Sequence, residues 1–209
     1  MSVISISNIT KCFGEKTLFQ DFSLEIQNGT FYAITGRSGC GKSTLLNIIG
    51  GIESVSSGDI TILGHKNIKQ HGTKLRKLLR NHISFLFQNY ALSDADSVEA
   101  NLMMALQYSK VKDKKLAIKE ALKTVQLEGL EKQKIYTLSG GEQQRVAIAR
   151  MLLKPTSIVL ADEPTGNLDA VNRDIVFNLL KDMKTHGVSI VMVTHDLELA
   201  KQCDVHIQL

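Results

Sequence analysis

A glycine-rich stretch between an apolar run and a helical pattern constrains the fold of this chain most strongly. Residues 36–44 read Gly-Arg-Ser-Gly-Cys-Gly-Lys-Ser-Thr, which fits the phosphate-loop pattern G-x-x-x-x-G-K-[ST]. The apolar residues 31–35 precede the loop, and in residues 42–49 Leu and Ile recur at the spacing of a helix face. A buried strand, a glycine loop and a helix in this order predict a parallel α/β core.

The residue types in this loop suit a nucleoside triphosphate. Glycine lets the backbone curl so that its N–H groups face the β-phosphate, Lys42 can neutralise the β- and γ-phosphates, and the Ser43 hydroxyl can bind Mg²⁺. A chance glycine turn is the alternative, but here motif and flanking pattern agree. We therefore expect phosphate contacts from the whole loop, which consists of Gly36, Arg37, Ser38, Gly39, Cys40, Gly41, Lys42, Ser43 and Thr44.

Two adjacent carboxylates end the apolar stretch of residues 157–161. Asp162 is suited to hold Mg²⁺ through water, whereas Glu163 reaches further and can polarise a water for in-line attack on a γ-phosphate. A solvated strand end that caps the next segment is the structural alternative. The phosphate loop earlier in the chain favours the functional interpretation.

Polar residues also close two other apolar runs. Gln88 follows residues 82–87, and His195 follows residues 188–194. Because the carboxyl ends of parallel strands share one edge of the sheet, both side chains are expected to converge on the γ-phosphate. A lone glutamine or histidine is usually a satisfied polar residue, but two at equivalent strand ends favour a site. The other histidines have no partner pattern and are interpreted as surface or packing residues: His65, His71, His82, His186 and His206.

A second candidate anion site begins at residue 138, where the chain reads Leu-Ser-Gly-Gly-Glu-Gln-Gln-Arg. Ser139 and two glycines run into a helix-forming stretch, so a hydroxyl and backbone N–H groups gather at the positive end of a helix. An N-cap followed by permissive glycines explains the same residues without a ligand. The stronger phosphate loop earlier in the chain favours the anion site.

The remaining pattern divides the chain into three kinds of structure. Alternating apolar residues over about 1–30, resumed at about 58–64, predict a small antiparallel sheet. Helical spacing without strands over about 92–154 predicts a helical insertion, and alternating strands and helices elsewhere predict a parallel core. Residues 1–209 are therefore interpreted as one α/β domain interrupted once.

Composition indicates a soluble globular protein, with 43% hydrophobic and 22% charged residues. No apolar run approaches the length of a membrane span, and the first residues lack the features of a signal peptide. We therefore expect a cytoplasmic location. The three cysteines are odd in number and form no CxxC pair, which favours reduced thiols over disulfides or a zinc site.

The net charge of +4 is too small to indicate a nucleic-acid partner, and none is expected, although it suits a protein near an anionic membrane surface. The densest basic run contains Lys110, Lys112, Lys114 and Lys115. It has no interleaved aromatic residues and leads into a helical pattern. We interpret it as a solvated face rather than a binding patch.

Taken in order, these motifs resemble the ATP-binding subunits of ABC transporters, and the resemblance covers essentially all of the chain. The family's Walker A matches residues 36–44, its Q-loop Gln88, its signature residues 138–145, its Walker B residues 158–162, its D-loop residues 167–169 and its switch histidine His195. The resemblance implies a P-loop, RecA-like parallel-sheet core with an N-terminal antiparallel β sub-domain and an inserted helical sub-domain.

The resemblance also implies an ATPase that uses ATP and Mg²⁺. The implied catalytic residues are Glu163, His195, Gln88 and Lys42, and the implied magnesium ligands are Ser43, Gln88 and Asp162. Phe13 stands where the family usually has an adenine-stacking tyrosine. Stacking on the base needs only the ring, so this change implies little loss of affinity.

Assembly is a further implication of the resemblance. The family forms an ATP-bound, head-to-tail homodimer, in which the signature of one subunit completes the phosphate loop of the other. The residues acting across that interface would be Leu138, Ser139, Gly140, Gly141 and Glu142, with Asp169 in the D-loop. The implied partner is an integral-membrane permease, so the subunit is expected to lie peripherally on the inner face of the cell membrane.

Within the family, residues 160–169 resemble the group that serves macrolide and bacteriocin exporters and lipoprotein-release systems. Such a subunit drives its permease for export or mechanotransmission. Ala100 stands where this group commonly has glutamate, in the segment that meets the permease.

Two other function classes predict sequence features that differ from those of this chain. A soluble ABC ATPase acting on nucleic acid or the ribosome predicts a long coiled coil between phosphate loop and signature, or two tandem cassettes. A P-loop GTPase predicts an Asn-Lys-x-Asp guanine motif, and neither a P-loop kinase nor a GTPase gives a role to residues 138–145. The chain has no long coiled coil in that interval, no second cassette and no Asn-Lys-x-Asp motif.

Overall fold

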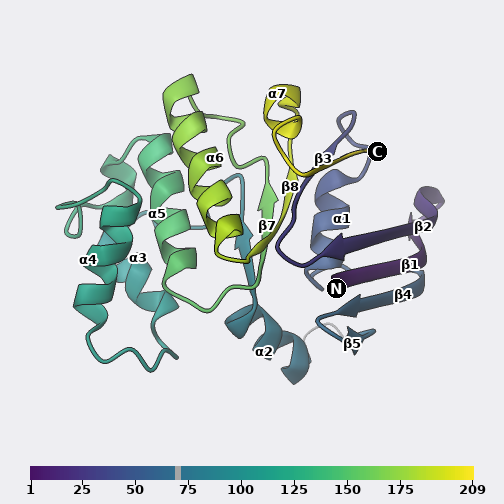
Figure 1. Cartoon of the computed structure of the whole chain (residues 1–209), viewed down its shortest axis with the longest axis horizontal. Helices are drawn as coiled ribbons and strands as arrows, with labels where there is room; N and C mark the ends of the chain where they lie inside the picture. Colours follow the sequence, from purple (N-terminus) through teal and green to yellow (C-terminus); the bar gives the residue numbers. More distant parts are fainter. Residues whose placement is uncertain (69–71) are drawn as a thin grey trace.

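The computed structural model describes residues 1–68 and 72–209, which form two sheets and a helical region (Figure 1). His71, interpreted above as a surface or packing residue, lies outside the described residues. The central sheet is parallel, with the order β6-β7-β8-β3-β9. Its strands are β6 (Ile83–Leu86), β7 (Ile158–Asp162), β8 (Ser189–Val193), β3 (Phe31–Thr35) and β9 (Val205–Gln208).

The parallel sheet is covered on both faces, and every residue of β3 and β8 is buried. On β3, Tyr32 and Ile34 join the hydrophobic core beneath α1 (Lys42–Ile49). Phe31 and Ala33 point the other way, into the core formed with α5 (Gly140–Leu152) and α6 (Ala170–Thr185). The two cores hold the carboxyl ends of the strands at one edge.

A second sheet is antiparallel, with the order β2-β1-β4-β5. Its strands are β1 (Ser2–Phe13), β2 (Lys16–Gln27), β4 (Ser57–Ile62) and β5 (His65–Lys66). Alternate residues of β1 and β2, including Ile4, Ile6 and Ile26, are buried in the core that α1 shares. This shared core holds the β1–β2 hairpin against the phosphate loop.

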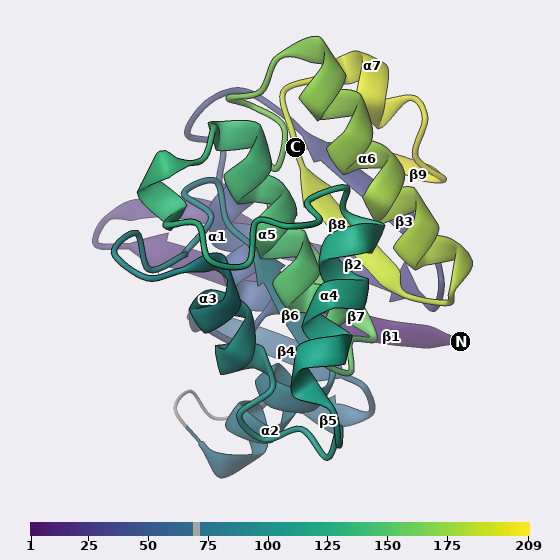
Figure 2. The same cartoon turned by 90° about the vertical axis from the view of Figure 1, so that its left-hand side faces the viewer.

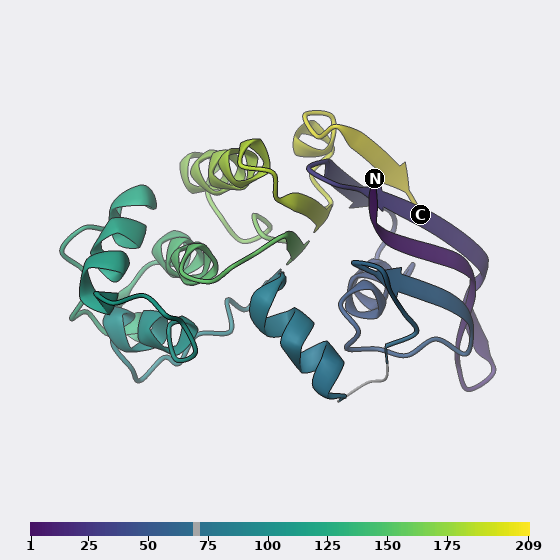
Figure 3. The ribbon, with the colours of Figure 1, turned by 60° about the horizontal axis from the view of Figure 1, so that its bottom comes forward.

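The helical region contains α3 (Val98–Ala105), α4 (Lys114–Thr124), the short 3₁₀ helix η1 (Ile135–Thr137) and α5. Figures 1 and 3 show it on the opposite side of the parallel sheet from the antiparallel sheet. After α5 the chain returns to the sheet at β7, continues through α6 and β8, and ends with α7 (Leu197–Ala200) and β9. The expected fold class is confirmed: a P-loop, RecA-like parallel core with an antiparallel β part and an inserted helical part.

One helix was not predicted from the sequence. α2 (Thr73–Asn81) buries Leu75 and Leu78, three residues apart, and exposes its charged residues. Its low overall hydrophobicity hides this pattern from a search for apolar runs. Among the described residues, no helix has the length and apolar character needed to cross a bilayer, and all three cysteines are free.

Candidate functional site

The phosphate loop turns directly from β3 into α1. Gly41 caps α1 with φ +103°, and its carbonyl accepts the first helical hydrogen bond from the Leu45 N–H at 2.8 Å. A Cβ on Gly41 would lie 2.7 Å from the Phe19 ring and 2.9 Å from Leu18. Glycine is thus required both by the left-handed backbone and by the close approach of β2.

Lys42 is the first residue of α1 and is only 6% exposed. Its Nζ donates to the carbonyls of Gly36 at 3.0 Å and Arg37 at 3.1 Å. The lysine charge is therefore held by neutral dipoles rather than by a carboxylate. Lys42 thus places a positive charge that has no carboxylate partner at the N-terminus of α1. This arrangement favours the binding of phosphate.

Ser43 and Asp162 bring a hydroxyl and a carboxylate together at the sheet edge. The Ser43 hydroxyl donates to Asp162 Oδ1 at 3.0 Å. Asp162 is the last residue of β7, paired in register with Val193 of β8. Oxygen atoms of these two kinds are hard ligands that suit Mg²⁺.

Glu163 follows Asp162 with φ +46°, a left-handed conformation that is rare outside glycine. Its N–H donates to the Val193 carbonyl at 3.0 Å, and its side chain is 14% exposed. Oε2 accepts from the His195 N–H at 3.2 Å, while Oε1 lies 3.2 Å from His195 Nε2 and makes no hydrogen bond. Backbone strain retained beside paired polar groups is typical of a functional position.

Burial raises the pKa of the Glu163 carboxyl, although the His195 and Lys42 charges and the His195 N–H oppose the shift. A carboxyl with a raised pKa is a stronger base than an exposed glutamate. Together with the free Oε1, this suits Glu163 to accept a proton from water.

Lys42, Ser43, Glu163 and His195 meet in one cleft of about 510 Å³, and Asp162 contacts the lining residue Ser43. Its lining residues are Phe13, Lys16, Leu18, Ser38, Gly39, Gly41, Lys42, Ser43, Thr44, Gln88, Glu163, Gly166 and His195. Residues from the β hairpin, the phosphate loop and three strand ends thus converge. The cleft is large enough for a nucleotide, with Phe13 half exposed at its rim.

Some expected residues lie elsewhere, and some lining residues were not predicted. Gly36, Arg37 and Cys40 line a separate cleft of about 370 Å³ that also touches His195. Lys16 and Leu18 reach the main cleft because the β1–β2 hairpin folds over α1. No pattern in the sequence indicates that contact.

The signature residues do not line this cleft. Ser139 caps α5, and its N–H and hydroxyl both donate to Glu142 Oε2, at 2.8 and 2.7 Å. The Glu142 N–H donates back to Ser139 Oγ at 3.3 Å, which completes a capping box. These bonds lower the pKa of the Glu142 carboxyl, so it is an anion at neutral pH.

The signature helix is tied to the segments that follow Walker B. The Gln144 amide donates to the Pro164 carbonyl at 2.7 Å, and Arg145 donates to Asn172. Asn172 in turn donates from its side chain and its N–H to Asp169, the N-cap of α6, at 2.7 and 2.9 Å. A displacement of α5 would therefore also displace the D-loop through these hydrogen bonds.

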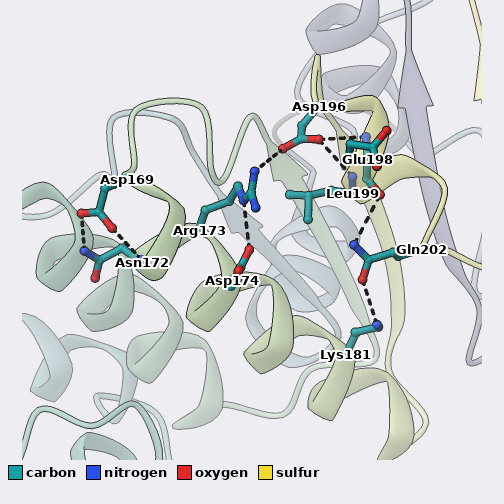
Figure 4. A network of polar contacts seen from close by, with 9 residues as sticks. All are labelled: Asp169, Asn172, Arg173, Asp174, Lys181, Asp196, Glu198, Leu199 and Gln202. Atoms are coloured by element: carbon teal, nitrogen blue, oxygen red, sulfur yellow. Dashed lines mark hydrogen bonds and ion pairs between the residues drawn. The ribbon is translucent and has the colours of Figure 1, made fainter.

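Figure 4 follows this polar network from α6 to α7. Arg173 contacts Asp174 at 3.0 Å and Asp196 at 3.4 Å. Asp196 follows His195 and caps α7 by accepting from the Glu198 and Leu199 N–H groups. The residue next to His195 is thus anchored to the helix that begins at the D-loop.

Comparisons with known proteins show the family of this chain. The family model described as "ABC transporter" matches residues 19–166. The lipoprotein-releasing system ATP-binding protein LolD of Francisella tularensis subsp. holarctica is 40% identical over 208 residues, covering 96% of this chain and 90% of LolD.

Two further matches broaden the comparison. The macrolide export ATP-binding/permease protein MacB of Mannheimia succiniciproducens is 38% identical over 215 residues, and the match covers all of this chain but only 33% of MacB. Among solved structures, a dimeric ATP-binding cassette in a post-hydrolysis state with ADP and Pi superposes with a TM-score of 0.87. That cassette is 34% identical, and the match covers 99% of this chain and 94% of the cassette.

Proposed function

Because this chain belongs to the ABC transporter family and is an ATP-hydrolysing cassette of that family, we propose that two copies assemble head to tail around two ATP molecules. One observation carries the proposal: the cleft with the phosphate loop and the N-terminus of α5 are separate within one chain. In the dimer, Ser139 and Gly141 of one subunit contact the γ-phosphate held by the Lys42 loop of its partner.

Five of the cleft residues have distinct roles in ATP binding and hydrolysis. The Phe13 ring stacks on the adenine, and Lys42 neutralises the β- and γ-phosphates. Glu163 accepts the proton of the attacking water, and His195 orients Glu163 through its N–H. Gln88, which also lines the cleft, positions the attacking water.

Ser43, Asp162 and Gln88 would hold Mg²⁺, and the adjacent hydroxyl and carboxylate of the first two residues fit that ion. The metal would neutralise phosphate charge as it develops during hydrolysis. Among the described residues, no three His, Cys, Asp or Glu side chains gather as a metal site. Phosphate oxygens and water would complete the coordination of the ion.

A complementation experiment tests the composite site. In a heterodimer of Lys42→Ala and Ser139→Ala chains, one intact site remains if sites form between chains. The matched control pairs wild type with a chain carrying both changes, which leaves no intact site although the total composition is the same. With the two chains of each mixture carrying different affinity tags, we expect ATP-induced capture of one chain by the other only in the first mixture. Dimerisation only in the control would instead assign both halves to one chain.

We also propose that the cassette drives an integral-membrane permease from the inner face of the cell membrane, as an export or mechanotransmission device. A groove of about 370 Å³ between α2, β6, α3 and α5 supports this docking. Phe85, Phe87 and Met104 line it, and Met104 is 53% exposed. An apolar groove beside Gln88 can transmit permease contact to the cleft.

The docking groove has its own test. Met104→Arg should abolish co-purification with the permease from native membranes while leaving ATP hydrolysis by the isolated chain unchanged. Leu116→Arg, at an equally exposed position on α4, is the control. Retention of the permease by Met104→Arg would remove the groove from the interface.

A further inference from the structure

Positive charge on this protein is concentrated on one face. Segments 73–81 and 106–115 together contain eight Lys or Arg and one Asp, a net charge of +7. The whole chain carries +4, so the other 190 residues sum to −3. The positive potential of this protein is therefore concentrated at these two segments, and the rest of the chain is mildly acidic.

The first basic segment is the outward face of α2. Leu75 and Leu78 anchor the helix in the protein, whereas Lys74, Arg76 and Lys77 are exposed. No described residue forms an ion pair with any of these three cations. Their charges are available to an external anion.

A contact between α2 and the α3–α4 loop joins the second segment to the first. The Arg80 guanidinium lies over the Tyr108 ring, 4.0 Å from its centroid. Tyr108 is followed closely by the exposed Lys110 and Lys112. Figures 1 and 2 place α2 and this loop on the same side of the molecule. We define the basic surface as Lys74, Arg76, Lys77, Arg80, Lys110, Lys112 and Lys115.

The sequence alone favoured a solvated face for the lysine run at residues 110–115, but the contact with α2 adds four cations to it, and apolar side chains lie among these charges. Tyr108 is 65% exposed and Val111 43% exposed, on either side of Lys110. Exposed apolar and amphipathic residues between lysines suit a bilayer interface, where rings and aliphatic groups enter the headgroup layer and lysines meet phosphates. The groove with Met104, where we place the permease, adjoins the same face.

We propose that the basic surface binds the anionic phospholipid headgroups of the membrane that holds the permease. This inference rests on the proposed function only for the identity of that membrane. Headgroup binding holds the cassette beside the bilayer and orients the docking groove toward its partner. It requires neither ATP nor the dimer.

Vesicle binding tests the proposal. The full chain is mixed with vesicles of phosphatidylcholine alone or with added phosphatidylglycerol, and bound protein is separated by flotation. We expect binding only to the anionic vesicles, weakening as salt rises. The double variant Arg76→Gln/Lys77→Gln should bind about 25-fold more weakly, since each cation near an anionic surface contributes about fivefold.

The matched control is Lys181→Gln/Lys201→Gln, which removes the same charge from α6 and the segment that follows α7. This control should bind as wild type, and both variants should keep normal ATP hydrolysis because neither pair lines the ATP cleft. Equal weakening by both variants, or equal wild-type binding to neutral vesicles, would overturn the proposal.

A second polyanion separates the membrane from nucleic acid. If the chain bound duplex DNA as tightly as the anionic vesicles, and Arg76→Gln/Lys77→Gln weakened both, the surface would be a general polyanion site and the membrane assignment would be wrong. If the complementation experiment failed while vesicle binding survived, only the composite ATP site would be excluded.

Discussion

The phosphate loop and the signature segment both place anion-binding groups at a helix N-terminus, yet they satisfy those groups in opposite ways. Lys42, a cation, donates to two neutral carbonyls. Ser139 donates its neutral N–H and hydroxyl to an anion, the Glu142 carboxylate. A phosphate reaching Lys42 replaces dipoles, whereas a phosphate reaching Ser139 must displace a negative charge.

Because of this difference, we expect the phosphate loop and the signature to differ in their affinity for phosphate. The phosphate loop can bind a triphosphate within one chain, because the incoming anion gains a full charge interaction. The Ser139 N–H and hydroxyl are already bonded to Glu142, so in the proposed dimer they gain only when the partner presents a phosphate that its own lysine holds. The asymmetry favours nucleotide binding first and dimerisation second.

The largest expected effect comes from the chemistry of the cleft. Glu163→Gln should lower ATP hydrolysis by about 10² to 10⁴, roughly 3 to 5 kcal/mol, because the amide cannot accept the proton from water. ATP binding remains, so the variant should accumulate as an ATP-bound dimer. Steady-state phosphate release and size-exclusion chromatography measure the two effects, and wild-type turnover would exclude Glu163 as the base.

The next effect perturbs the signature half alone. A Cβ on Gly141 would clash with the Asn172 side chain, so Gly141→Ala must displace that side chain from Arg145 and Asp169 or move the D-loop helix. We expect a loss of about 1–3 kcal/mol in unfolding free energy, together with weaker ATP-driven dimerisation. Thermal unfolding and analytical ultracentrifugation measure these changes.

Gly140→Ala is the control for this substitution. Its Cβ would meet only the Tyr90 hydroxyl at 2.9 Å, the far end of a side chain that can move. Its stability should therefore change much less than that of Gly141→Ala. Equal losses in both variants would show that backbone freedom, rather than the contact with Asn172, matters there.

The raised pKa of Glu163 gives the cleft a pH signature. Protonated Glu163 cannot act as a base, so kcat/KM should fall about tenfold per pH unit below its pKa, and that fall should begin above the ordinary glutamate range. The loss appears on acidification because only the ionised form is active. Measurements of kcat/KM over a pH series determine where this fall begins. A fall that begins only at the pKa of an exposed glutamate would contradict the assignment of Glu163 as the base.

The smallest effect tests the internal competitor itself. Glu142→Gln keeps the capping box, since glutamine can also reach the Ser139 N–H, but removes the negative charge. ATP-driven dimerisation should therefore strengthen by about threefold to tenfold at low salt, with the difference shrinking as salt rises. Weaker dimerisation would mean that the carboxylate supports the signature instead of competing with phosphate.

Several elements could be predicted from local pattern. Strand, loop and helix around residues 31–49 follow from one motif and its flanks, and α1 begins at Lys42 as expected. The order of strands and helices after residue 157 also follows from alternating periodicity. The short α2 was missed because its two buried leucines are outnumbered by charges.

By itself, the sequence determined which chemical groups are available and in what order: the phosphate loop, the carboxylate pair after β7, and a serine with two glycines at the start of α5. Periodicity is local, so it can assign such groups to strand ends and helix starts. It cannot say which distant segments touch.

Only the tertiary structure decided how those groups are satisfied and which of them meet. It placed Lys16 and Leu18 over the phosphate loop, set Glu163 in a left-handed conformation against His195, and stacked Arg80 on Tyr108. Each of these contacts joins segments that are separate in the sequence. Their partners depend on how sheets and helices pack, which no single segment encodes.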